Sequence, residues 1–119
     1  MKKNQHLFKR LGFAFAGLLI AIKSEKSIRF QLVAAFGVFI VLILLQPPLL
    51  WWAIIILVVA VVLAAELFNT ALEAICDLVH PAYHEKIKIA KDVAAAGVLM
   101  ISISSIAIGL LFLYETVQP

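Results

Sequence analysis

Long apolar runs, separated by short polar connections, dominate the chain. No charged residue occurs from Phe30 to Ala65, and only the turn sequence QPPLLWW breaks this run. Pro47-Pro48 would stop a helix there, and Trp51-Trp52 suit a membrane–water boundary. Another apolar run, interrupted only by serines, covers Val93 to Tyr114. The pattern predicts three transmembrane helices, at residues 29–46, 49–79 and 89–115.

The first apolar run is shorter and has a different pattern. Leu11 to Ile22 would extend only about 18 Å as a helix, against a hydrocarbon core of about 30 Å. Its apolar side chains fall on one stripe, with Lys9 and Arg10 off that stripe. The run ends in KSEKSIR without a small-residue cleavage pattern, which argues against a signal peptide. We therefore expect residues 6–24 to form an amphipathic helix lying in the membrane interface.

The composition agrees with one membrane domain over residues 1–119. The chain is 65% hydrophobic and 14% charged, whereas a globular domain is roughly half apolar and a quarter charged. The sequence has no zinc-ligand spacing, Walker-type loop or dinucleotide fingerprint, and nothing indicates a nucleic-acid partner. The single cysteine, Cys76, excludes an internal disulfide and fits a packing role better than a catalytic one.

The basic residues predict the orientation in the membrane. Most of the ten Lys and Arg residues precede Phe30, and the others are Lys86, Lys88 and Lys91. The Pro-Pro turn and the C-terminal tail carry none. The positive-inside rule then places the N-terminus and the HPAYHEKIKIAKD loop in the cytoplasm, and the C-terminus outside.

The second predicted span ends in an acidic face. Glu66, Asn69, Glu73 and Asp77 fall within an arc of about 80° on a helix. Glu66 would lie about 26 Å from the start of the span at Leu49, close to the cytoplasmic edge of the hydrocarbon. Ionisable groups in a membrane are expensive and usually functional. Carboxylates with an amide between them suit Mg²⁺. Because these residues lie at one membrane boundary, one substrate could come from the lipid and another from the cytosol.

Several alternatives remain open at this point. The acidic face could serve a small oligomeric ion or drug transporter, or only hold helices together. Lys91 is equally a phosphate ligand or an ordinary positive-inside lysine, and His84 a nucleotide contact or a solvated loop residue. Glu25 would usually be a surface charge. No role for Asp77 follows from its position.

The segments AELFNTALEAICDL and YHEKIKIAKDVAAAGVL resemble the small prokaryotic diacylglycerol kinases, a family that includes undecaprenol kinases. The pattern E-x-x-N-[ST]-A-x-E-x-x-x-D, followed by A-K-D-x-x-[AS]-A, is kept without a gap. The resemblance covers nearly the whole chain. It implies a homotrimer in the bacterial inner membrane, with active sites between subunits. The reaction would be transfer of the γ-phosphate of MgATP to a lipid hydroxyl.

The resemblance also implies roles for individual residues. Glu66 would be the general base, supported by Asn69, and Glu25 and Glu73 would hold the metal ion and contact ATP. Lys91 and Asp92 would contact the phosphates of ATP, Tyr83 and His84 would contact its adenosine end, and the remaining ATP contact would be Phe13. The lipid would contact Glu66, Arg10 and Ala95.

Two branches of this family differ in the lipid that they phosphorylate and in the sequence of one segment. The diacylglycerol branch tends to show E-x-A-F-R-x-E, and the undecaprenol branch E-R-N-x-R-x-H. The present segment, EKSIRFQ, has Ser27, Arg29 and Gln31, which is slightly closer to the undecaprenol pattern but does not match it. Phe13 stands where the family often has Tyr, which weakens the expectation of a nucleotide contact there. We expect conversion of diacylglycerol to phosphatidic acid, with undecaprenol as the alternative acceptor.

Overall fold

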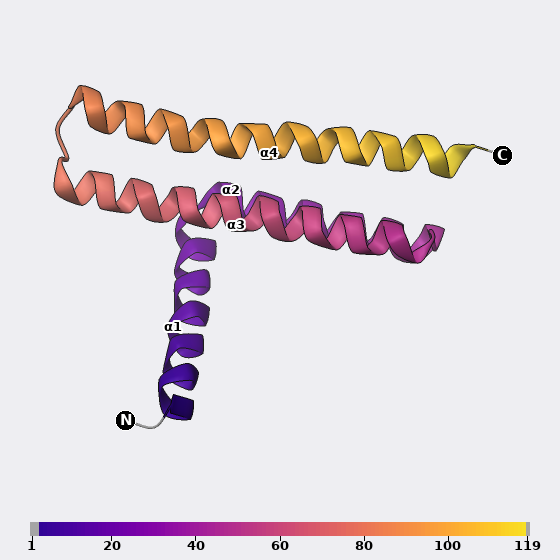
Figure 1. Cartoon of the computed structure of the whole chain (residues 1–119), viewed down its shortest axis with the longest axis horizontal. Coiled ribbons are helices and arrows are strands. Elements are labelled where there is room, and N and C mark those ends of the chain that lie inside the picture. Colours follow the sequence, from indigo (N-terminus) through magenta and orange to yellow (C-terminus); the bar gives the residue numbers. More distant parts are fainter. Residues whose placement is uncertain (1–2, 119) are drawn as a thin grey trace.

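The computed structural model describes residues 3–118, and the side chains of residues 6–118. It contains four helices in the order α1 Lys3–Ser24, α2 Lys26–Leu45, α3 Leu49–Val79 and α4 Glu85–Val117 (Figure 1). Helix α3 has the bounds expected from the sequence. The other three helices begin three or four residues earlier than expected, and α4 ends two residues later. The apolar pattern alone does not reveal these polar helix ends.

Local backbone chemistry explains where the helices end. Gln46 adopts the left-handed conformation, with φ 47°, and its N–H donates to Leu42 O. Pro48 then starts α3, where a missing N–H costs nothing. The side chain of His84 accepts a hydrogen bond from the Lys86 N–H and caps α4, which explains the early start of that helix. Glu25 has extended backbone angles and separates α1 from α2.

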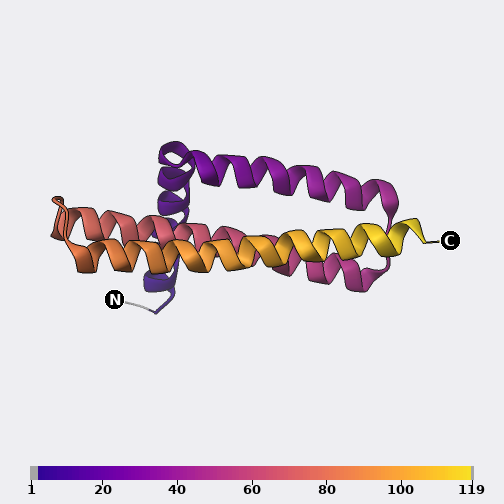
Figure 2. The same cartoon turned by 90° about the horizontal axis from the view of Figure 1, so that it is seen from above.

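Helices α2, α3 and α4 run alongside one another, and α1 leaves them at a steep angle (Figures 1 and 2). Helix α3 lies centrally and contacts each of the other three helices. The corner between α1 and α2 is held by Arg29, whose Nη1 donates to Ile22 O at 2.8 Å and Lys23 O at 2.9 Å. Below, "loop end" means the end of the long helices at residues 80–84, and "turn end" the end at residues 46–48.

The best-packed region lies at the turn end. Leu42, Ile55 and Phe112 form a buried apolar cluster that joins α2, α3 and α4. The Trp51 ring packs edge-on against Phe112 with centroids 5.2 Å apart, and its Nε1 donates to the Glu115 carboxylate. This cluster fixes α4 against α3 at the end of the helices opposite Glu73 and Asp77.

Most apolar side chains of the long helices are nevertheless exposed. The accessible surface is 9214 Å², whereas a water-soluble monomer of 13.1 kDa would expose about 6,400 Å². Three helices, α2, α3 and α4, are long and apolar enough to cross a membrane. Their exposed faces need lipid or further protein, which is the arrangement of a multi-pass membrane protein. The interfacial placement of α1 stays a prediction.

Candidate functional site

Glu66 is held by two donors from the neighbouring helix. Gln31 Nε2 donates to Glu66 Oε1 at 3.0 Å, and Ser27 Oγ donates to Glu66 Oε2 at 3.3 Å. Both donors belong to the N-terminal half of α2, which lies beside Glu66 because α2 and α3 are antiparallel. The N-terminal end of a helix also carries partial positive charge, which favours a nearby carboxylate. Glu66 is thus a half-buried carboxylate with a fixed orientation.

One turn further along α3, Asn69 and Glu73 form a second polar pair. Asn69 Nδ2 lies 3.5 Å from Glu73 Oε1 and donates to it. Asn69 Oδ1 is buried and has no hydrogen-bond partner among the described residues. Asn69 also lines a cavity of about 380 Å³, whose other walls include Ala94 and Gly97 of α4. An oxygen ligand is therefore available beside the Glu73 carboxylate.

Two lysines of α4, Lys88 and Lys91, are engaged in ion pairs. Lys91 Nζ lies 2.5 Å from Asp77 Oδ1, across the α3–α4 interface at the loop end. Lys88 Nζ lies 2.6 Å from Asp92 Oδ2, one helical turn away. Lys91 and Asp92, both expected at the phosphates, therefore have protein partners here. Asp77 is the ion-pair partner of Lys91.

The α3–α4 loop places two histidines together. The rings of His80 and His84 lie 5.1 Å apart in an edge-on arrangement. His80 Nδ1 is 2.8 Å from Ala82 O, while His84 caps α4 through its Nδ1. Tyr83, between them, is 76% exposed. The expected adenosine contacts thus lie on an open surface.

The other expected site residues are more dispersed. Arg10 and Phe13 are exposed on α1, and Ala95 is exposed on α4. Glu25 is half-buried at the α1–α2 corner, and its side chain makes no capping hydrogen bond. Within residues 6–118, no hydrogen bond or ion pair joins these four side chains to Glu66 or Glu73.

The donor chemistry fits a hard cation only in part. Asn69 Oδ1 and the Glu73 carboxylate are neighbouring oxygen ligands of the kind that Mg²⁺ accepts. Across the described residues, no group of three or more His, Cys, Asp or Glu is placed to hold a metal ion. Mg²⁺ commonly takes one or two carboxylates and completes its shell with water and phosphate oxygens. Residues Asn69 and Glu73 therefore fit a metal that arrives with a nucleotide.

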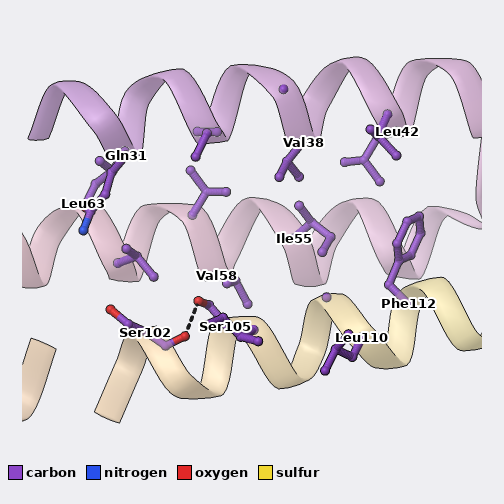
Figure 3. Close-up of a pocket in the computed structure, with 18 of the residues that line it drawn as sticks. Gln31, Val38, Leu42, Ile55, Val58, Leu63, Ser102, Ser105, Leu110 and Phe112 are labelled. Carbon is purple, nitrogen blue, oxygen red and sulfur yellow. Dashed lines mark hydrogen bonds between the residues drawn. The ribbon is translucent and has the colours of Figure 1, made fainter. Parts of the chain in front are cut away.

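A long apolar groove runs from the site toward the turn end. Its volume is about 810 Å³, and α2, α3 and α4 all contribute to its walls (Figure 3). Gln31 lies at one end and Phe112 near the other. Ser102 and Ser105 also line the groove, but the Ser105 hydroxyl donates to the Ser102 carbonyl and is already satisfied. The groove thus presents an apolar surface up to the Glu66 site.

The fold and site define a multi-pass helical membrane protein with an acidic cluster at one end of its spans. The profile of the prokaryotic diacylglycerol kinase family matches residues 12–113. The chain belongs to this family, which confirms the resemblance identified from the sequence.

Two characterised relatives differ in their named substrates. The chain is 36% identical over 98 residues to a diacylglycerol kinase of Synechocystis sp., a match covering 82% of this chain and 56% of that protein. It is 35% identical over 104 residues to the undecaprenol kinase of Bacillus subtilis, covering 87% of this chain and 85% of that protein. Both names are those of lipid kinases, and they differ in the acceptor lipid.

Two features of the site were missed in the sequence. The sequence identified Ser27 and Gln31 only as positions that differ between family branches, yet both donate hydrogen bonds to Glu66. Their spacing of one helical turn was the available signal. The Asp77–Lys91 pair had no such signal, because it depends on how α3 and α4 pack.

Proposed function

We propose that this protein transfers the γ-phosphate of ATP to the hydroxyl of a membrane lipid at the cytoplasmic membrane face. Membership of the prokaryotic diacylglycerol kinase family supports this proposal. The observation that carries it in the structure is Glu66, an oriented carboxylate where an apolar helix becomes polar. A lipid alcohol and a soluble nucleotide can meet only at such a boundary.

The helix lengths support a site at that boundary. Helix α3 has 31 residues, or about 46 Å, and exceeds the hydrocarbon core by about 16 Å. If the turn end lies at the outer boundary, Glu66 falls near the inner edge of the hydrocarbon and Asp77 beyond it. The basic loop then faces the cytoplasm of a bacterial inner membrane, in agreement with the positive-inside rule.

The proposed reaction uses Glu66 as the general base. Its carboxylate accepts the proton of the lipid hydroxyl while the hydroxyl oxygen bonds to the γ-phosphorus. The bond from that phosphorus to the bridging β–γ oxygen breaks, and ADP leaves. Phosphoryl transfer depends mainly on positioning and charge neutralisation. Fixing Glu66 against Gln31 and Ser27 contributes the positioning.

Other side chains would bind the nucleotide and its metal. Glu73, with Asn69 beside it and Glu25, would hold Mg²⁺, which neutralises phosphate charge when bound. Lys91 would exchange Asp77 for a phosphate oxygen as ATP enters. Tyr83, His84 and Asp92 would complete the nucleotide contacts, with Phe13 approaching from α1. Arg10 and Ala95 would contact the lipid.

We further propose that the protein acts as a homotrimer with sites shared between subunits. The large exposed apolar surface supports assembly, and the incomplete metal ligand set among the described residues of one chain supports a contribution from a neighbour. Diacylglycerol is the first expected acceptor and undecaprenol the alternative.

The test offers labelled ATP and Mg²⁺ to purified protein in separate mixed micelles of diacylglycerol, undecaprenol and ceramide. Transfer of label to one of these lipids is the expected result. ATP-independent ion flux in vesicles, without labelled lipid, would instead support a transporter and contradict the proposal.

A further inference from the structure

The two oxygens of Glu66 are held by different donors, and the donors are not equivalent. Gln31 Nε2 is the closer donor, at 3.0 Å, and its bond is partly buried. Ser27 Oγ is 3.3 Å away, and its bond is exposed. Water can replace an exposed hydroxyl more readily than a buried amide. Gln31 is therefore the donor that decides how Glu66 is oriented.

We infer that Gln31 is a positioning residue that aims the Glu66 carboxylate at the lipid hydroxyl and so raises the rate of phosphoryl transfer. The inference rests on the proposed kinase function and adds to it a residue that acts through Glu66. A flexible glutamate at the membrane edge has several rotamers, and only those facing the acceptor are productive. A fixed donor on α2 selects among them.

An amide suits this task because it is uncharged and is not a titratable acid. A lysine or arginine at position 31 would pair with the carboxylate and reduce its tendency to accept a proton. A second carboxylic acid would compete for the same proton. The glutamine amide fixes the carboxylate without placing a charge or a second acid beside it.

The orientation of the Gln31 amide is itself determined by Glu66. Reversing the amide would bring Gln31 Oε1 against a carboxylate oxygen, and two acceptors would then repel each other. In the observed orientation, Oε1 is buried without a hydrogen-bond partner among residues 6–118. An unpaired buried acceptor is unfavourable, and an apolar side chain would avoid it. Packing alone therefore does not account for a glutamine at this position.

The position of Gln31 in the groove supports the same role. It lies at one end of the groove (Figure 3) and donates to Glu66, and it is the only polar side chain that α2 contributes to the lining. The apolar surface of the groove meets the carboxylate at this residue. Gln31 thus stands between the hydrocarbon and the reacting group.

The test compares three variants that separate the length of the side chain at position 31 from the presence of a hydrogen-bond donor. Gln31→Met keeps the length but removes the donor. Gln31→Asn keeps the amide but withdraws it by about 1.5 Å, beyond hydrogen-bond distance of Glu66. Gln31→His keeps a ring N–H donor at a similar reach. A matched control, Gln118→Met, changes a glutamine at the C-terminal end of α4.

We expect kcat with the preferred lipid to fall on the order of tenfold in both Gln31→Met and Gln31→Asn, with KM for ATP unchanged. Gln31→His should recover most of the lost rate, and Gln118→Met should behave as wild type. Thermal unfolding and size-exclusion profiles report assembly for each variant. If Gln31→Met fails to assemble, the comparison of Gln31→His with Gln31→Asn decides, since both keep a polar side chain.

Wild-type kcat in Gln31→Met would overturn the inference, as would a Gln31→His variant no faster than Gln31→Asn. A fall in kcat only in proportion to lost assembled protein would also overturn it, because the role would then be structural. If wild-type protein phosphorylates no lipid, the proposed function itself fails. The two failures are therefore distinguishable.

Discussion

Replacing Glu66 with glutamine should separate catalysis from folding. Glu66→Gln removes the proton acceptor but keeps the size and shape of the side chain. The new amide can still accept from Gln31 Nε2 through its oxygen, and its NH₂ can donate to the Ser27 hydroxyl. The variant should therefore fold and assemble, while the lipid hydroxyl loses its base.

The structure sets the expected magnitudes of the effects of Glu66→Gln on stability and on the rate of phosphoryl transfer. Hydrogen bonds to a charged group contribute about 1.5–3 kcal/mol and neutral ones about 0.5–1.5 kcal/mol. The Ser27 bond is exposed, so the loss comes mainly from the Gln31 bond, about 1–2 kcal/mol of stability. Loss of a general base reduces rates by about 10²- to 10⁴-fold, or about 2.7–5.5 kcal/mol of activation free energy. The effect on rate should exceed the effect on stability.

The assay measures transfer of labelled phosphate to lipid in mixed micelles, with thermal unfolding of the same samples. Glu115→Gln is the matched control, since Glu115 also accepts a hydrogen bond across helices, from Trp51, but at the turn end. It should lose some stability and keep its rate. A Glu66→Gln variant with turnover within about threefold of wild type would refute the assignment of Glu66 as the base.

Three further predictions follow from contacts elsewhere in the structure. Lys91→Met should raise KM for ATP, whereas Asp77→Asn should not, because it leaves the lysine in place without a carboxylate that competes with the phosphate; nucleotide titrations showing equal increases would contradict this difference. Trp51→Phe removes the hydrogen bond to Glu115 but keeps the ring against Phe112, so the unfolding temperature should fall slightly at unchanged kcat; a fall in kcat without a fall in stability would contradict this separation. Chelation with EDTA should abolish transfer and added Mg²⁺ should restore it, whereas activity that survives chelation would exclude the proposed metal site.

The sequence predicted the spans well because their causes are local. Pro47-Pro48 and the uncharged run before them mark the turn between α2 and α3 without any knowledge of packing. The helix ends at Lys3 and Glu85 were harder, because polar residues continue a helix without an apolar signal. His84 caps α4 through its side chain, and histidine is not a strong capping signal in a sequence.

The sequence predicts that Glu66, Asn69 and Glu73 lie together, but it does not predict the hydrogen-bond and ion-pair partners of the candidate site residues. Glu66, Asn69 and Glu73 share one face because helical periodicity requires it. The partners of Glu66 and Lys91 come from other helices. The register of α2 and α4 against α3 decides those contacts, and apolar periodicity does not fix that register in a membrane protein whose helices are apolar on all sides. These pairings therefore needed the structure.

The spacing of Glu66 and Lys91 bears on how many chains form one active site. Asp77 follows Glu66 by about 16 Å along α3, and Lys91 Nζ is held 2.5 Å from Asp77. While that ion pair persists, Lys91 and Glu66 of one chain cannot both reach the transferred phosphoryl group, because reacting atoms approach within about 3.5 Å. A neighbouring chain that supplies one of the two would resolve this distance.

Mixing Glu66→Gln with Lys91→Met chains, at an ATP concentration too low for Lys91→Met alone to turn over, tests that arrangement. In trimers assembled at random from equal amounts of Glu66→Gln and Lys91→Met chains, sites shared between neighbours should regain about one quarter of wild-type activity. A site built within one chain would regain none, because every chain carries one of the two lesions. Absence of recovery in mixtures shown to exchange subunits would contradict the shared site. Lys91, once released from Asp77 by ATP, would then also have to move along α3 toward Glu66 of its own chain before each transfer.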